Sequence, residues 1–166
     1  AGMGVVYAGA LVASVTLLRI SPSYGLAAIL WIFAVVWGAD VAAYFAGRSI
    51  GGPRLWSSVS PGKTWSGAIV GAFAGAVLGL MLMAWTNRFI PLFWLGLATA
   101  IVSALGDLFE SALKRRFGVK DSSGLIPGHG GLMDRLDAFV AASVFAAVVA
   151  GLNSRSSFIA GGLFQW

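Results

Sequence analysis

Two groups of carboxylates are the side chains best suited to chemistry in this sequence. Asp107, Glu110 and Ser111 are spaced by three and four residues, which places them on one face of a helix. Asp134 and Asp137 repeat the three-residue spacing further along the chain. Hard divalent cations such as Mg²⁺ bind one or two carboxylates in proteins, and substrate phosphates and water complete their coordination. The pattern therefore indicates a site for a metal ion and a phosphate.

The segment between these carboxylates is rich in bases and glycine. A glycine-rich stretch over residues 124–131 follows four bases, which are Lys114, Arg115, Arg116 and Lys120. Glycine lets backbone N–H groups approach an anion, and the bases supply positive charge. Two simpler explanations stay open: the bases set membrane topology or contact lipid headgroups, or each acid pairs with a base such as Arg135. Because bases, acids and glycines alternate, we favour the metal and phosphate site.

Two further places carry polar side chains of interest. The residues 60–64 resemble a phosphate-binding P-loop only in part, because that motif requires a glycine where Ser57 stands. Lys63 and Thr64 are candidates to bind a phosphate from a loop, and the alternative is that they are solvated. His129, the one histidine, is suited to binding phosphate, transferring a proton or shaping its loop. A single histidine without any cysteine excludes the usual zinc sites.

The elements that hold these groups must lie in a membrane. Of 166 residues, 58% are hydrophobic and 10% are charged, whereas an average soluble domain is about 25% charged. Five apolar stretches approach the roughly 20 residues that a transmembrane helix needs, and they cover residues 3–18, 24–45, 65–85, 89–106 and 136–152. We therefore predict an all-α, polytopic transmembrane protein with about five transmembrane helices.

Glycines in the third stretch predict close helix packing. Gly67, Gly71, Gly75 and Gly79 recur every four residues. A helix with this spacing presents a smooth ridge to which another helix can pack closely.

The few charged residues predict the orientation in the membrane. Eight of the eleven bases lie between the second and third stretches or between the fourth and fifth: Arg48, Arg54, Lys63, Lys114, Arg115, Arg116, Lys120 and Arg135. Because bases are retained in the cytoplasm, we expect both connections there and the carboxyl terminus outside. The six acids fall on the same side: Asp40, Asp107, Glu110, Asp121, Asp134 and Asp137. One polar, cytosol-facing site between helices explains this sorting.

The run of residues 111–137 resembles the hallmark segment of the phosphatidate cytidylyltransferase (CDP-diacylglycerol synthase) family. Segments 37–48 and 60–67 are also similar to that family, although Ser66 stands where many members have Glu. The resemblance is close over residues 35–136 and rests on hydropathy elsewhere. It implies a single transmembrane catalytic domain over residues 1–166, which we expect to be the carboxyl-terminal portion of a longer chain because bacterial members extend further at the amino end.

The resemblance implies Mg²⁺-dependent nucleotidyl transfer at the bacterial cytoplasmic (inner) membrane, in which CTP and phosphatidate form CDP-diacylglycerol and pyrophosphate. A phosphatidate oxygen attacks the α-phosphorus of CTP, and because this oxygen is already anionic, the protein mainly positions the reactants and neutralises charge. Asp107 and Asp134 are then the principal metal ligands, with Glu110, Asp121 and Asp137 as further ligands or orienting groups. A second cation that bridges the phosphates is compatible with this chemistry.

The remaining candidates rest on the chemistry of the residues together with this resemblance. The catalytic set is Asp107, Asp121, Asp134 and Lys120, and the substrate-binding set is Lys63, Thr64, Lys114, Arg115, His129 and Arg135. The expected partners are CTP, phosphatidate and membrane lipids, not nucleic acid; a homodimer stays open, as do the acyl-chain preference, the residues that read cytosine and the role of Asp40. The alternatives are a CTP-dependent enzyme for another lipid phosphate, and an ion or solute transporter, which is disfavoured because the carboxylates gather at one membrane face.

Overall fold

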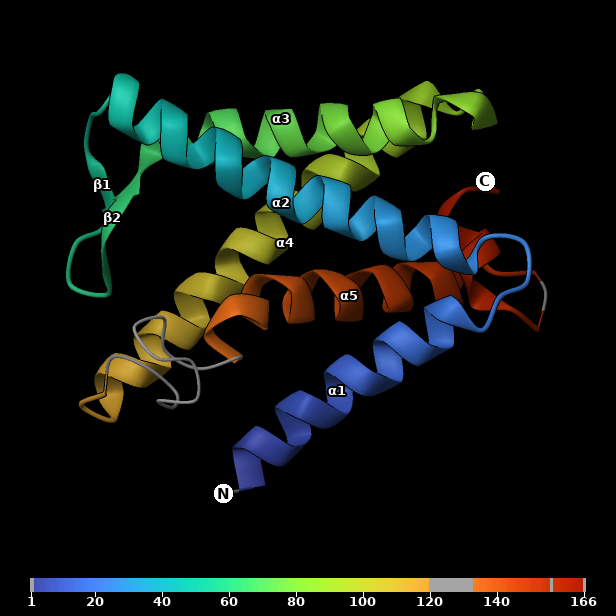
Figure 1. The fold of residues 1–166 in the computed structure, drawn as a ribbon, viewed down its shortest axis with the longest axis horizontal. Helices are drawn as coiled ribbons and strands as arrows, with labels where there is room; N and C mark the ends of the chain where they lie inside the picture. The colour runs from blue at the N-terminus through green and yellow to red at the C-terminus, as the bar shows by residue number, and fades with distance from the viewer. Residues whose placement is uncertain (1, 120–132, 156, 166) are drawn as a thin grey trace.

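The computed structural model describes residues 2–119, 133–155 and 157–165, without the side chains of residues 2, 3 and 133–135. Five long helices dominate these ranges (Figure 1): α1 Gly2–Arg19, α2 Gly25–Ser49, α3 Trp65–Leu82, α4 Phe89–Arg116 and α5 Met133–Asn153. The short elements are the strands β1 Arg54–Trp56 and β2 Ser60–Thr64 and the 3₁₀ helices η1 Ala84–Thr86 and η2 Ile159–Leu163. Successive helices run in alternating directions along the bundle. The strands β1 and β2 lie at one end of the bundle, which we call the hairpin end.

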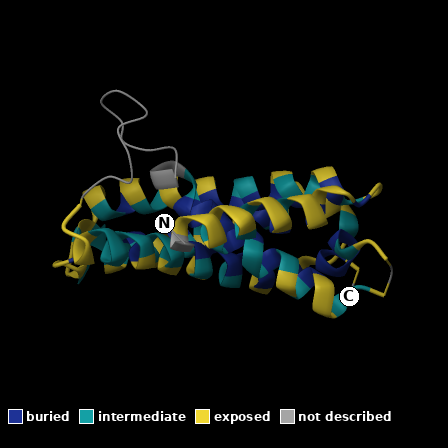
Figure 2. Ribbon diagram, turned by 90° about the horizontal axis from the view of Figure 1, so that it is seen from below, coloured by how far each residue is buried: buried dark blue, intermediate teal, exposed yellow. Residues whose placement is uncertain are grey.

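Four of these helices are long and apolar enough to cross a membrane: α2, α3, α4 and α5. Only 28% to 44% of the residues in their apolar windows are buried within the protein. Figure 2 shows the exposed residues along the outer faces of the helices, where large side chains such as Phe45, Phe73 and Trp94 lie. A surface of this kind requires lipid around it. The predicted polytopic helical membrane protein is confirmed, and the first expected span is the shorter apolar helix α1.

The glycine ridge of α3 packs closely against another helix, as the spacing predicted, and the structure shows that this helix is α2. A Cβ atom added at Gly71 would lie 2.7 Å from the carbonyl oxygen of Ala39, and one added at Gly75 would lie 2.6 Å from that of Val35. Gly67 and Gly79 are buried in the same way. Any side chain on this ridge would push the two backbones apart. The absence of side chains therefore fixes how closely α2 and α3 pack.

The helix α4 extends further than its apolar stretch predicted. It ends at Arg116 rather than near residue 106, because the added segment is rich in good helix formers and has bases in its last turn, where they favour the helix dipole. A helix of 28 residues is about 42 Å long, which exceeds the roughly 30 Å hydrocarbon layer. Asp107, Glu110 and Lys114 consequently lie on a rigid helix and not in a loop.

The connection between α2 and α3 is a β-hairpin, although residues 60–64 were expected to form a loop. The strands β1 and β2 are antiparallel, with Arg54 opposite Thr64 and Trp56 opposite Ser60. Gly51 and Gly52 have φ values of 67° and 107°, which glycine adopts without steric cost. Strand pairing satisfies the backbone groups of this connection. It also holds Lys63 at a defined place beside the helix bundle.

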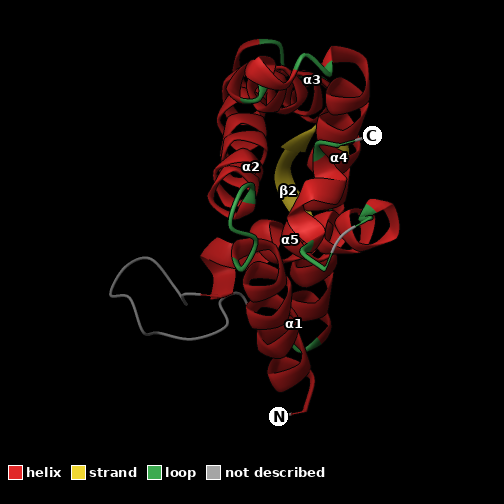
Figure 3. Ribbon diagram, turned by 90° about the vertical axis from the view of Figure 1, so that its right-hand side faces the viewer, coloured by secondary structure: helices red, strands yellow, loops and turns green. Residues whose placement is uncertain are grey.

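The helix α1 lies on the outside of the bundle. In the end-on view of Figure 3, α5 lies beneath α2, α3 and α4, and α1 lies next to α5. Ser14 of α1 and Ser143 of α5 are buried and share a hydrogen bond of 3.0 Å. Within the membrane such a polar contact joins two otherwise apolar helices.

Candidate active site

An ion pair between β2 and α4 forms the centre of the polar site at the hairpin end. The Nζ atom of Lys63 contacts Oδ2 of Asp107, a residue 44 positions away in the sequence. Ser111 Oγ donates to the other carboxylate oxygen, Asp107 Oδ1, at 3.4 Å. The predicted helical face that carries Asp107 and Ser111 is therefore confirmed. Both oxygens of Asp107 are engaged, and its side chain remains 28% exposed.

Glu110 lies one turn along α4 and is more deeply placed. Lys114 Nζ is 3.4 Å from Glu110 Oε1, and the Tyr7 hydroxyl of α1 donates to Glu110 Oε2 at 3.3 Å. The side chains of Glu110 and Lys114 are 12% and 16% exposed. The simple pairing of an acid with a neighbouring base thus occurs at Glu110. Since the pair is largely withdrawn from water, its charges act more strongly on their surroundings than exposed ones do.

Asp137 lies in the same site, near the amino-terminal end of α5. Its Oδ1 accepts a hydrogen bond of 2.7 Å from the N–H of Ala138, and the residue is buried. The approach of α5 to α4 depends on Gly106, because a Cβ atom there would lie 2.3 Å from the Cβ of Ala141. Gly106 immediately precedes Asp107, so the close contact between the helices brings the acids of α4 and α5 together.

The site gathers more carboxyl groups than lysines among the described residues. Asp137 interacts electrostatically with Asp107, Glu110 and Lys114. Asp40 of α2 interacts with Asp107 and Lys63. Four carboxylates from three helices therefore face two lysines. Buried or half-buried acids are costly within a membrane, and they are typical of functional sites there.

The donor atoms suit a hard cation in kind, but the described residues do not complete a cage for one. No group of three or more Asp, Glu or His side chains is arranged to hold a metal ion within residues 2–119, 136–155 and 157–165. Asp107 and Glu110 provide carboxylate oxygens, which Mg²⁺ prefers together with phosphate oxygens and water. A divalent cation at this site would therefore need ligands from outside the described side chains or from a substrate.

Several predicted site residues lie elsewhere or outside the described residues. Thr64 caps the amino end of α3, where its Oγ1 accepts from the N–H of Gly67 at 3.1 Å and lies 3.0 Å from Ser66 Oγ. Ser66 Oγ donates to the carbonyl of Gly51. Arg115 is exposed on the last turn of α4. The residues outside the description are Lys120, Asp121 and His129, and for Asp134 and Arg135 only the backbone of α5 is described.

Two residues of this site were missed by sequence reasoning. Tyr7 reaches the carboxylates from α1, and its signal was a phenol near the end of an apolar stretch, where tyrosine often marks the membrane interface. Nothing in the sequence distinguished Gly106 from the other glycines of the chain. Its role follows only from the packing of α4 against α5.

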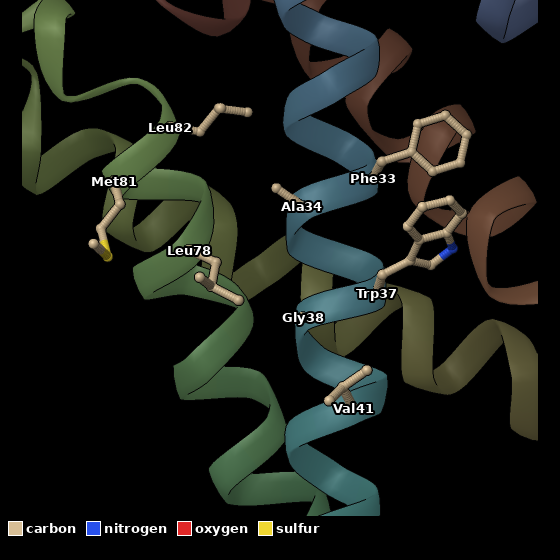
Figure 4. Close-up of a pocket in the computed structure, with 8 residues that line it drawn as sticks. All are labelled: Phe33, Ala34, Trp37, Gly38, Val41, Leu78, Met81 and Leu82. Carbon is tan, nitrogen blue, oxygen red and sulfur yellow. The ribbon is translucent and has the colours of Figure 1, made fainter.

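An apolar groove on the outer face of α2 and α3 is separate from these carboxylates. Its volume is about 650 Å³, and its lining includes Phe33, Trp37 and Val41 of α2 and Leu78 and Met81 of α3. Figure 4 shows Leu78 directed towards α2 at the level of Gly38. The groove is lined entirely by apolar residues and glycine. It therefore belongs to the lipid-facing surface.

Comparisons with known proteins agree with the resemblance of the motifs. A model of the cytidylyltransferase family matches residues 1–152. A phosphatidate cytidylyltransferase of Brucella suis is 48% identical over 155 residues, which cover 89% of this chain and 57% of the relative. The corresponding proteins of Haemophilus influenzae and Bacillus subtilis are 45% and 43% identical over 131 and 120 residues, covering 75% and 70% of this chain and 46% and 45% of the relatives. The chain thus spans about half the length of these curated relatives, and it belongs to the cytidylyltransferase family.

Proposed function

We propose that this chain is the catalytic part of a phosphatidate cytidylyltransferase, which forms CDP-diacylglycerol and pyrophosphate from CTP and phosphatidate. The observation that carries the proposal is the contact between Lys63 and Asp107. These residues come from separate parts of the chain, and Lys63 lies in one of the segments that resemble the family. The name of the relatives, phosphatidate cytidylyltransferase, supports the same activity.

The geometry suits a transfer in which charge is neutralised and no strong base is needed. A phosphatidate oxygen forms a bond to the α-phosphorus of CTP, while the bond from that phosphorus to the oxygen bridging to the β-phosphate breaks and pyrophosphate leaves. Lys63 and Lys114 supply positive charge at the half-buried site, where it stabilises the developing negative charge more than it would in water. We propose that Arg115, which is exposed at the end of α4, meets a phosphate that arrives from solution.

Mg²⁺ is the cation that we propose for this site. Asp107 and Asp134 are its proposed principal ligands, and Glu110, Asp121 and Asp137 are proposed as further ligands or orienting groups. When bound, the cation would neutralise charge on the phosphates, and a second cation could do the same. The oxygen donors of Asp107 and Glu110 and the excess of acids over lysines support this assignment.

The remaining residues of the site are proposals from the family resemblance. Lys120 joins Asp121 as a catalytic candidate, while Thr64, His129 and Arg135 are substrate-binding candidates. Because Thr64 Oγ1 accepts a hydrogen bond from Gly67 as the cap of α3, its contribution to phosphate binding would run through the position of the helix. We also propose that the hairpin end faces the cytosol of a bacterial cell, because the bases gather there.

The test is a turnover assay with the purified protein in detergent. CTP and phosphatidate are supplied with Mg²⁺ or with EDTA, and other nucleotides and other lipid phosphates are supplied in parallel. Product formation from CTP and phosphatidate that requires Mg²⁺ is the expected result. A preference for another lipid phosphate would replace phosphatidate as the proposed substrate. Ion flux in proteoliposomes without nucleotide turnover would contradict the proposal. An Arg155→Ala variant, exposed near the opposite end, is the control that should keep full turnover.

A further inference from the structure

Tyr7 joins three helices at the carboxylate site. Its hydroxyl lies 3.3 Å from Glu110 Oε2 of α4 and 3.1 Å from the carbonyl oxygen of Asp137 of α5. These partners are 103 and 130 residues away in the sequence. A phenol has one proton to donate, so the two acceptors share it. The contact therefore couples the positions of α4 and α5 through a side chain of α1.

Glu110 is held at both carboxylate oxygens by this arrangement. Lys114 contacts Oε1 and Tyr7 contacts Oε2, and the side chain of Glu110 is only 12% exposed. A carboxylate fixed at both oxygens cannot rotate freely. It therefore also fixes the ammonium group of Lys114, one of the two described lysines that face the acids.

The rest of α1 supports a positioning role. Leu11, Ser14 and Leu18 follow Tyr7 at helical spacing, and they pack into the protein, with Ser14 bonded to Ser143. The hydroxyl of Tyr7 brings a hydrogen bond from α1 to a carboxylate of the site. The apolar face of α1 packs against the bundle, and the Tyr7 hydroxyl continues this contact into the polar site.

We propose that Tyr7 is a positioning residue for cytidylyl transfer, acting through Glu110 on Lys114, and this inference rests on the function proposed above. Placement of a charged group by a fraction of an ångström strongly affects catalysis that depends on preorganised charge. Loss of the hydroxyl should leave the fold and the substrates' access intact. It should lower the rate of the chemical step.

The test compares Tyr7→Phe with Tyr24→Phe in the purified protein. Tyr24 accepts a hydrogen bond of 3.2 Å from Gln165 at the opposite end of the bundle, so each variant removes one tyrosine hydroxyl that is hydrogen-bonded. We expect Tyr7→Phe to lower kcat about tenfold, with the KM for CTP changed less than about twofold. Tyr24→Phe should keep the wild-type kcat, and both variants should show similar, small losses of Tm. A kcat for Tyr7→Phe equal to that of Tyr24→Phe would overturn the inference.

Two further measurements separate positioning from general stabilisation. If Tyr7 acts through Glu110, the double variant Tyr7→Phe with Glu110→Gln should be no slower than Glu110→Gln alone; a multiplied loss would overturn the proposed route. Amide hydrogen exchange at the start of α5 should be faster in Tyr7→Phe than in Tyr24→Phe, and equal exchange would overturn the coupling. Because exchange needs no turnover, it tests Tyr7 even if CTP and phosphatidate prove not to be the substrates.

Discussion

Replacement of Lys63 by methionine tests the central ion pair most directly. The variant keeps an unbranched side chain but removes the charge that faces Asp107. The loss of one partner costs about 3–5 kcal/mol for a fully buried pair, and an exposed pair contributes about 0–1 kcal/mol. Because the two side chains are 31% and 28% exposed, solvent screens part of the interaction. We therefore expect a loss of about 2 kcal/mol in the free energy of unfolding.

A double-mutant cycle with Asp107→Asn isolates this interaction. The neutral pair Lys63→Met with Asp107→Asn should be more stable than Lys63→Met alone by about 1 kcal/mol, because no uncompensated carboxylate remains. Thermal unfolding in detergent measures these differences. Arg54→Met, on the neighbouring strand of the hairpin and exposed, is the matched control and should stay close to wild type.

The same variant should also lose activity. Removal of one preorganised electrostatic group typically lowers kcat by about 10²–10³-fold, and we expect a decrease of that order for CTP-dependent turnover in Lys63→Met. If the stability losses of Lys63→Met and Asp107→Asn simply added in the double variant, the contact between Lys63 and Asp107 would contribute nothing to stability. Turnover equal to that of Arg54→Met would remove Lys63 from the site.

The remaining predictions concern the metal, the phosphate and the glycine ridge. Asp134→Asn should abolish turnover without changing Tm, and near-normal turnover would contradict its assignment as a metal ligand. Arg115→Ala should raise the KM for CTP or phosphatidate if Arg115 contacts a phosphate. Unchanged kinetics would leave Arg115 with a role in membrane topology alone. Gly71→Ala should lower stability by about 1–3 kcal/mol, because its Cβ would lie 2.7 Å from a backbone oxygen of α2. Gly9→Ala, with no atom within 4 Å of its Cβ, should be neutral, and equal effects of the two would contradict close packing.

The apolar stretches and the glycine spacing were enough to predict most of the helices and the close packing of one of them against a neighbour. Hydrophobic length predicts a membrane helix because the bilayer is a solvent of fixed thickness. The ridge of Gly71 and Gly75 predicted close packing because small residues determine how near two backbones can come. The end of α4 at Arg116 was not predicted, since polar residues beyond the membrane carry no hydropathy signal. The hairpin was missed because its strands β1 and β2 are very short.

By itself the sequence determined the membrane setting, the helical face of Asp107 and Ser111, and the family to which the chain is similar. These features depend on local spacing and composition, which one stretch of chain contains completely. Only the tertiary structure decided that Lys63 pairs with Asp107 and that Tyr7 bonds to Glu110. Such pairs join residues 44 and 103 positions apart, and their meeting depends on how helices pack, as at Gly106. No local pattern contains that information, because it belongs to the surfaces of two elements together.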